Sequence, residues 1–259
     1  AYIATALIVA AVHAYYLLQD RTSDFHRRAF GLALAVAMVC IPLQLVSGDY
    51  SAKTVADTQP AKFAAMEGHY ETQAGAPLII GGIPDDEAME TAYAIKVPGF
   101  LSFLAEWDFS AKVTGLEDIP RDEWPNTRIV HWAFDLMVTC GMLMMGLALW
   151  GGWQWWRSGR IPTGSWLLRA AVAAGPLGFI AIEAGWVVTE VGRQPWIIYD
   201  VMRTKEAVTP MEGLVVPFAT FTGLYVVLSV LVLFLLRRQF AQTHPETLAS
   251  AESVASQEE

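Results

Sequence analysis

Two acidic residues lie within an apolar stretch of the chain that is long enough to cross a lipid bilayer. The segment EAGWVVTEVGRQPW places Glu183, Trp186 and Glu190 on one face of a helix, because they occupy positions i, i+3 and i+7. A carboxylate at membrane depth is costly and is usually retained for a function, such as a proton path or a cofactor pocket. Arg193 follows Glu190 by three residues and could pair with it, which leaves Glu183 unexplained.

A second apolar segment carries His131, Asp135 and Met137. A histidine and an aspartate at positions i and i+4 can hydrogen-bond, whereas Met137 lies about 200° round the helix from Asp135. Methionine in an apolar helix usually packs in a core, although it can also be an axial haem ligand. His13, near the end of the first apolar stretch, is interpreted as a helix-end histidine that points to the membrane interface.

The composition indicates a membrane protein. Hydrophobic residues make up 54% of the 259 residues and charged residues only 17%, compared with about 25% charged residues in soluble domains. The formal net charge of -9 and the lack of a basic stripe argue against nucleic-acid binding. Cys40 and Cys140 both fall in apolar runs and are interpreted as small buried hydrophobes.

We expect an all-α integral membrane protein with about five transmembrane helices in a bundle. Residues 1–47 would form two of them, the first truncated, and residues 129–240 three more. Residues 48–128 would form a long extracytoplasmic loop, and residues 241–259 a disordered acidic tail. The apolar stretches that carry this expectation are residues 2–18, 29–47, 129–154, 166–190 and 213–236.

Basic residues predict the orientation. They concentrate in the connections at 19–28 and 155–169 and at the start of the tail, and these three regions alternate with the long loop and the 191–212 connection. The positive-inside rule places them, and the C-terminus, in the cytoplasm. The long loop then faces outside.

The long loop contains a helix-like stretch from about Pro60, with Lys62 and Glu67 near each other on one side. A solvated amphipathic face would also explain that spacing. The loop's apolar segments favour a small folded cap over a disordered insert, which is the alternative.

Three stretches in this order resemble subunit I of cytochrome bd quinol oxidases: GDYSAKTVADTQPAKFAAMEGHYET, FDLMV at 134–138, and EAGWVVTEVGRQPW. The resemblance covers nearly the whole chain up to the tail. It implies a C-terminal part of that subunit, with the short form of the quinol-binding loop, and leaves a cyanide-insensitive form open. The family oxidises quinol at the outer face of the bacterial cytoplasmic membrane and reduces dioxygen to water, together with a subunit II.

The resemblance also implies cofactors and residue roles. The family uses a low-spin haem b, a high-spin haem b, and haem d or a third haem b. Met137 would be an axial ligand of the low-spin haem and Glu190 the protein ligand of the high-spin haem. The remaining implied roles are Trp186 in electron transfer, Arg193 at haem propionates, Glu183 in the haem pocket, and Lys62 and Glu67 in the quinol site.

Departures from the family pattern leave two other functions open. The histidine ligand of the low-spin haem would fall just before Ala1, and Asp135 stands near that haem where many members have arginine. An anion there should lower the haem's potential. The alternatives are a haem-poor structural paralogue and a proton-coupled transporter, although the sequence shows no internal repeat or broken helix of the kind transporters use.

Overall fold

The apolar segments form helices in a computed structural model of the chain, which describes residues 1–242. Five helical stretches are long and apolar enough to cross a membrane, so the expected all-α membrane architecture is confirmed. The chain divides into two compact units, Ala1–Ala207 and a second beginning at Val208. The expected acidic tail lies almost entirely outside the described residues.

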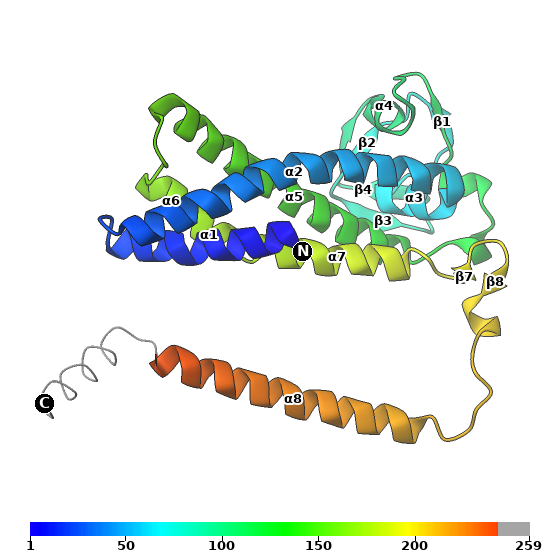
Figure 1. The fold of residues 1–259 in the computed structure, drawn as a ribbon. Coiled ribbons are helices and arrows are strands. Elements are labelled where there is room, and N and C mark those ends of the chain that lie inside the picture. The colour runs from blue at the N-terminus through cyan, green and yellow to red at the C-terminus, as the bar shows by residue number, and fades with distance from the viewer. Residues whose placement is uncertain (243–259) are drawn as a thin grey trace, which may run out of the picture. The chain divides into compact units, whose positions relative to one another are not determined.

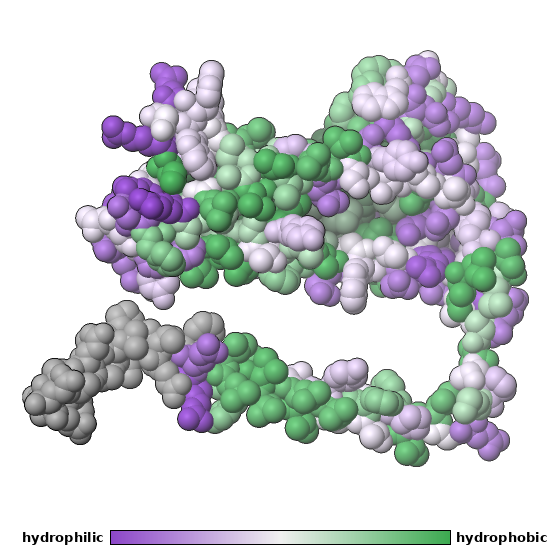
Figure 2. Space-filling model, in the orientation of Figure 1, coloured by the Kyte–Doolittle hydropathy of each residue, from purple (hydrophilic) through white to green (hydrophobic). Residues whose placement is uncertain are grey.

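The first unit contains four of the candidate spans (Figure 1). They are α1 (Tyr2–Gln19), α2 (Asp24–Thr58), α5 (Thr127–Ser158) and the pair α6 (Ser165–Ala174) and α7 (Leu177–Val191). The second unit contains α8 (Val215–Gln242). Hydrophilic side chains gather at the two ends of the first unit, and apolar side chains cover its middle (Figure 2).

Two helices differ from the expectation. α2 continues to Thr58, about three turns beyond the expected end near residue 47. Its last turns are polar, and the Lys53 ammonium lies 2.6 Å from the Asp49 carboxylate in an i,i+4 pair that supports a helix outside the apolar zone. The expected continuous helix 166–190 is interrupted at Gly175–Pro176, because proline cannot supply the backbone N–H that a continuous helix needs.

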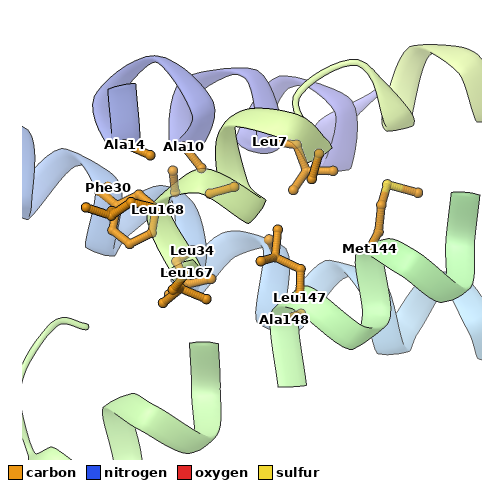
Figure 3. Packing of buried hydrophobic residues seen from close by; sticks show 14 of the residues in the cluster. Leu7, Ala10, Ala14, Phe30, Leu34, Met144, Leu147, Ala148, Leu167 and Leu168 are labelled. Atoms are coloured by element: carbon orange, nitrogen blue, oxygen red, sulfur yellow. The ribbon is translucent and has the colours of Figure 1, made fainter. Parts of the chain in front are cut away.

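The core of the first unit lies where α1, α2, α5 and α6 meet (Figure 3). Many of its buried residues are alanine, which lets helix backbones approach closely, as is typical of membrane bundles. Gly178 shows how tight the packing is, because a Cβ there would lie 2.6 Å from the Cα of Ala4 in α1. A Cβ at Gly151 of α5 would lie 3.0 Å from the Leu34 side chain of α2.

The connection between α2 and α5 is folded. It contains two short α-helices, two 3-10 turns and three antiparallel two-stranded ladders that pair β1 with β6, β2 with β5, and β3 with β4. Its elements are α3 (Pro60–Glu67), β1 (Gln73–Ala74), β2 (Leu78–Ile80), β3 (Ile83–Asp85), β4 (Glu90–Ala92), β5 (Ile95–Val97), α4 (Phe100–Glu106), β6 (Lys112–Val113), η1 (Leu116–Asp118) and η2 (Arg121–Glu123). We call this part, residues 59–126, the cap.

The cap has apolar centres of its own. One forms around Phe63, Leu101 and Val113, and another around Tyr70 and Leu116. Asn126 then starts α5 by accepting a hydrogen bond from the backbone N–H of Ile129. After α7, a short ladder of β7 (Trp196–Ile198) and β8 (Met202–Arg203) leads to η3 (Thr204–Glu206) and ends the first unit.

Candidate functional site

The helix α3 of the cap packs against the ends of α5 and α7. Ala65 and Met66 of α3 form one buried cluster with Val130 of α5 and Val188 of α7. Pro60 occupies the first turn of α3, where its missing N–H costs nothing, and Gly68 ends the helix with a left-handed φ of 58°. The cap therefore brings its candidate quinol residues, Lys62 and Glu67, to the two helices that carry Met137 and Glu190.

Lys62 lies beside the end of α7. Its side-chain carbons approach Gly192 so closely that a Cβ there would be 3.2 Å from Cγ and 3.3 Å from Cε. Partial burial lowers the pKa of Lys62, and the nearby Arg193 charge lowers it further, whereas Glu190 opposes both effects. The structure thus brings Lys62 to Glu190 and Arg193, which lie more than 120 residues further along the chain.

Glu67, the last residue of α3, is the most deeply buried acid among the candidates, with 5% of its surface exposed. Burial raises its pKa to about 8, and the negative charge of Asp135 contributes to the rise. A carboxyl with such a pKa is mostly protonated at pH 7 and releases its proton when the pH rises by about one unit. The environment therefore suits a group that exchanges protons.

Asp135 is held by two groups. Its carboxylate accepts a hydrogen bond of 2.8 Å from the backbone N–H of Gly81, in the turn between β2 and β3, and lies 3.5 Å from Nε2 of His131. The expected i,i+4 contact between His131 and Asp135 is therefore present. The contact with the Gly81 turn was not expected, and the Gly81–Gly82 pair is the sequence signal that could have indicated a close approach of backbone to a helix.

Met137 of α5 is half-buried, and its side chain faces Gly185 of α7. Its sulfur would be 3.2 Å from a Cβ at Gly185, so the glycine of EAGW makes room for it. Cys140 and Met144, further along α5, are buried. The Met137 thioether is a sulfur donor of the kind that can be an axial ligand of a haem iron.

Glu183, Trp186 and Glu190 share an exposed face of α7, and we call them the α7 face. Trp186 is 68% exposed and the Glu190 side chain 67%. Glu190 lies 3.6 Å from Arg193, as the sequence suggested, while Glu183 makes no ion pair within residues 1–239. The first unit does not cover this face.

These donors fit a haem better than a chelated metal ion. Within the described residues, no group of three or more histidine, cysteine, aspartate or glutamate side chains could hold a metal ion. A haem iron takes only one or two protein ligands, because its macrocycle supplies the others. A carboxylate and an indole on a face of a membrane helix, with an arginine one turn on, provide a ligand, an apolar surface and a partner for propionates.

Trp196 adds one observation that sequence reasoning missed. Its indole Nε1 is buried without a hydrogen-bond partner in the described part of the chain, at the end of the GRQPW segment. Buried indole N–H groups usually find an acceptor. The first unit therefore leaves a buried N–H donor near Arg193 without an acceptor.

Comparison with known proteins gives consistent matches. The family described as cytochrome bd terminal oxidase subunit I matches residues 1–244. A Bacillus subtilis (strain 168) protein provisionally named a cytochrome bd menaquinol oxidase subunit I is 40% identical over 98% of this chain and 58% of its own length. The cytochrome bd ubiquinol oxidase subunit 1 of the same organism is 32% identical over 90% of this chain and 53% of its own length.

A solved structure agrees. The bd oxidase from Geobacillus thermodenitrificans covers 93% of this chain with 38% identity and a TM-score of 0.78, and the match takes up 56% of that chain. The chain therefore spans somewhat more than half the length of these similar proteins.

Proposed function

The chain belongs to the cytochrome bd terminal oxidase subunit I family, and we propose that it forms the quinol-oxidising and part of the haem-binding region of such an oxidase. The reaction of the whole enzyme would be the oxidation of quinol and the reduction of dioxygen to water. The observation that carries the proposal is the position of α3. It packs on α5 and α7, the helices that carry Met137 and Glu190, and brings Lys62 and Glu67 to them.

Lys62 and Glu67 would act on the quinol. The ammonium of Lys62 can donate a hydrogen bond to a quinol oxygen, because it is only half-buried. Glu67 would accept a proton from the quinol hydroxyl when its carboxyl is ionised. Since oxidation of a quinol to a quinone releases two protons, a buried carboxyl with a pKa of about 8 next to the substrate is suited to the task.

The α7 face and Met137 would hold haem. A bound haem supplies one-electron redox chemistry and, at the high-spin site, a route to dioxygen. Glu190 would be the protein ligand of the high-spin haem b and Met137 an axial ligand of the low-spin haem b. Arg193 would pair with propionates, Glu183 would line the pocket, and Trp186 would lie along the electron path. The third haem would be haem d or another haem b.

Asp135 would tune the low-spin haem. It lies two residues from Met137, and its negative charge is partly offset by the Gly81 N–H and by His131. An uncompensated anion near a haem lowers its reduction potential. The observed contacts imply that the lowering is smaller than the charge alone would give.

The partners and orientation follow from the same proposal. The chain would lie in the bacterial cytoplasmic membrane with subunit II of the oxidase, with the cap outside and the C-terminus in the cytoplasm. The α7 face carries Glu183, which has no ion-pair partner among residues 1–239, and Glu190, whose partner Arg193 is itself exposed, and a charge left facing lipid hydrocarbon costs several kcal/mol. This cost supports a haem or a further polar partner on that face.

Quinol-dependent oxygen uptake by the complete complex tests the proposal, with Lys62→Gln as the variant and Lys112→Gln, on the exposed surface of the cap, as its matched control. We expect Lys62→Gln to raise KM for quinol about tenfold, the effect of losing one hydrogen bond to a charged group. The control should keep the wild-type KM. If the wild-type complex consumes no oxygen with quinol, the proposed function is wrong, and a structural paralogue or a proton-coupled transporter becomes the better interpretation.

A further inference from the structure

We propose that His131 is a positioning residue of the quinol site: through the two carbonyl oxygens that its ring nitrogens contact, it fastens the Gly81 turn and the end of α3 to α5 and thereby fixes Glu67. The inference rests on the proposed function and deepens it, because it assigns a role in the quinol site to a residue for which the sequence suggested only a contact with Asp135. His131 has no exposed surface, so water is not its partner.

Both ring nitrogens face carbonyl oxygens of other segments. Nδ1 lies 2.8 Å from the carbonyl oxygen of Met66, and Nε2 lies 3.1 Å from the carbonyl oxygen of Gly81. A carbonyl oxygen can only accept a hydrogen bond, so the ring is the donor in these contacts. One imidazole therefore links α5 to the end of α3 and to the Gly81 turn.

The surroundings of the ring are polar. Asp135, on the next turn of α5, lies 3.5 Å from Nε2 and also accepts the backbone N–H of Gly81. Arg128, one turn earlier on α5, donates to the carbonyl oxygen of Pro84. Three side chains of α5 therefore hold the same loop segment against this helix.

The contacts of the ring also restrict the residue that follows Glu67. A Cβ at Gly68 would lie 3.1 Å from both Nδ1 and Cε1 of His131, so the ring packs directly on this left-handed residue. On the other side, the Thr91 hydroxyl donates to the carbonyl oxygen of Gly68 at 2.8 Å. His131 bonds to Met66 and packs on Gly68, the two neighbours of Glu67, and this fixes where the carboxyl lies.

Removal of the ring nitrogens of His131 should free the Gly81 turn and the end of α3, which weakens quinol binding more than turnover at saturation. A variant that keeps a side-chain donor should recover part of the binding. A residue that only fills space would be replaced equally well by an aromatic ring.

The test uses the complete complex with His131→Phe, which removes the ring nitrogens but keeps an aromatic ring, and His131→Gln, which keeps a side-chain donor. Trp132→Phe is the comparator, because the Trp132 indole N–H donates a hydrogen bond of 2.8 Å to the carbonyl oxygen of Gly82 in the same turn. Hydrogen–deuterium exchange of peptides covering residues 78–92, KM and kcat for quinol and the haem spectrum are measured for each.

For His131→Phe we expect exchange in residues 78–92 to be at least tenfold faster and KM about tenfold higher, with kcat within a factor of three and a haem spectrum like wild type. His131→Gln should recover part of the wild-type KM, and Trp132→Phe should leave the KM near that of the wild type. Wild-type exchange and KM in both His131 variants, or a Trp132→Phe effect as large as that of His131→Phe, would overturn the inference. If the wild-type complex does not oxidise quinol, the proposed function fails, while the exchange data still decide whether His131 fastens the turn.

Discussion

Two groups of acidic side chains lie in the same unit of this chain, and they are satisfied in opposite ways. Glu67 is buried and Asp135 partly buried where the cap meets α5, with His131 and the Gly81 N–H as partners of Asp135. Glu183 and Glu190 lie on the α7 face, beside an indole that is 68% exposed. On that face only Glu190 has an ion-pair partner among residues 1–239, the exposed Arg193.

The two groups have different requirements. An acid removed from water can be tolerated when protonation, a nearby cation or a hydrogen-bond donor removes the cost of its charge, as protonation does for Glu67 and the Gly81 N–H does for Asp135. On the α7 face the first unit gives Glu190 only the exposed Arg193 and leaves Trp186 exposed, so a further partner for this face must come from outside the first unit. The cap junction is therefore expected to respond to changes in protons, and the α7 face to changes in a cofactor.

Glu190→Ala should give the largest effect, because it removes the proposed ligand of the high-spin haem. We expect the complete complex to lose nearly all of its high-spin haem b absorption while the low-spin band remains. Thr189→Ala, an exposed neighbour on α7, is the matched control and should keep both. An unchanged high-spin band in Glu190→Ala would mean that Glu190 is not the ligand of that haem.

Met137→Leu comes next, because leucine keeps the volume beside Gly185 but removes the sulfur donor. We expect the low-spin absorption band to fall or to change to a high-spin form, measured on the reduced complex. Met142→Leu, an exposed methionine on the same helix, should leave the spectrum unchanged. If the two variants give the same spectrum, Met137 is a packing residue.

Glu67→Gln tests the enclosed group. The acceptor acts when ionised, and because burial raises the pKa of Glu67 to about 8, its ionised fraction and the quinol oxidation rate should rise with pH up to about that value. In Glu67→Gln we expect turnover to fall about 100-fold, the usual worth of a positioned base, and the rise with pH to disappear. Glu71→Gln, an exposed acid four residues on, should keep the wild-type profile. A Glu67→Gln enzyme with wild-type turnover and pH profile would exclude Glu67 as the acceptor.

The same raised pKa affects stability. The protonated form of Glu67 is favoured in the folded state and the ionised form in the unfolded state between the ordinary value of 4.5 and about 8. Its contribution to stability is therefore fully present below pH 4.5 and is lost as pH rises through 8.

Asp135→Asn should give the smallest effect. The amide oxygen can still accept the Gly81 N–H, so the turn stays in place while one negative charge is removed. We expect the low-spin haem potential to rise by on the order of 50 mV, the effect of one charge acting over about 10 Å at an effective dielectric constant near 20. Redox titration measures it, and a potential that stays the same or falls would contradict the role of Asp135.

The sequence predicted the helices well because a membrane span is determined by a local property, the length of its apolar run. It failed at the end of α2, because the segment there is polar and yet remains helical. The i,i+4 pair of Asp49 and Lys53 supports these polar helical turns. It also missed the break at Gly175–Pro176, although the Gly-Pro pair was visible.

The candidate site was less accessible from sequence for a different reason. The spacing of Glu183, Trp186, Glu190 and Arg193 lies within one helix and its end, so periodicity predicted their common face. The contact of Lys62 with Gly192 and the bonds of His131 to Met66 and Gly81 join segments that lie about 50 to 130 residues apart. Such contacts depend on how the cap folds, and no local pattern encodes them.

The central proposal is that this chain serves a haem-containing quinol oxidase. The most direct test is a dithionite-reduced minus oxidised absorption spectrum of the purified complete complex. We expect bands of both low-spin and high-spin haem b, and a further red-shifted chlorin band if the third haem is haem d. A complex that is intact but shows no haem absorption would contradict it, because Met137 and the α7 face would then have to be explained without a cofactor.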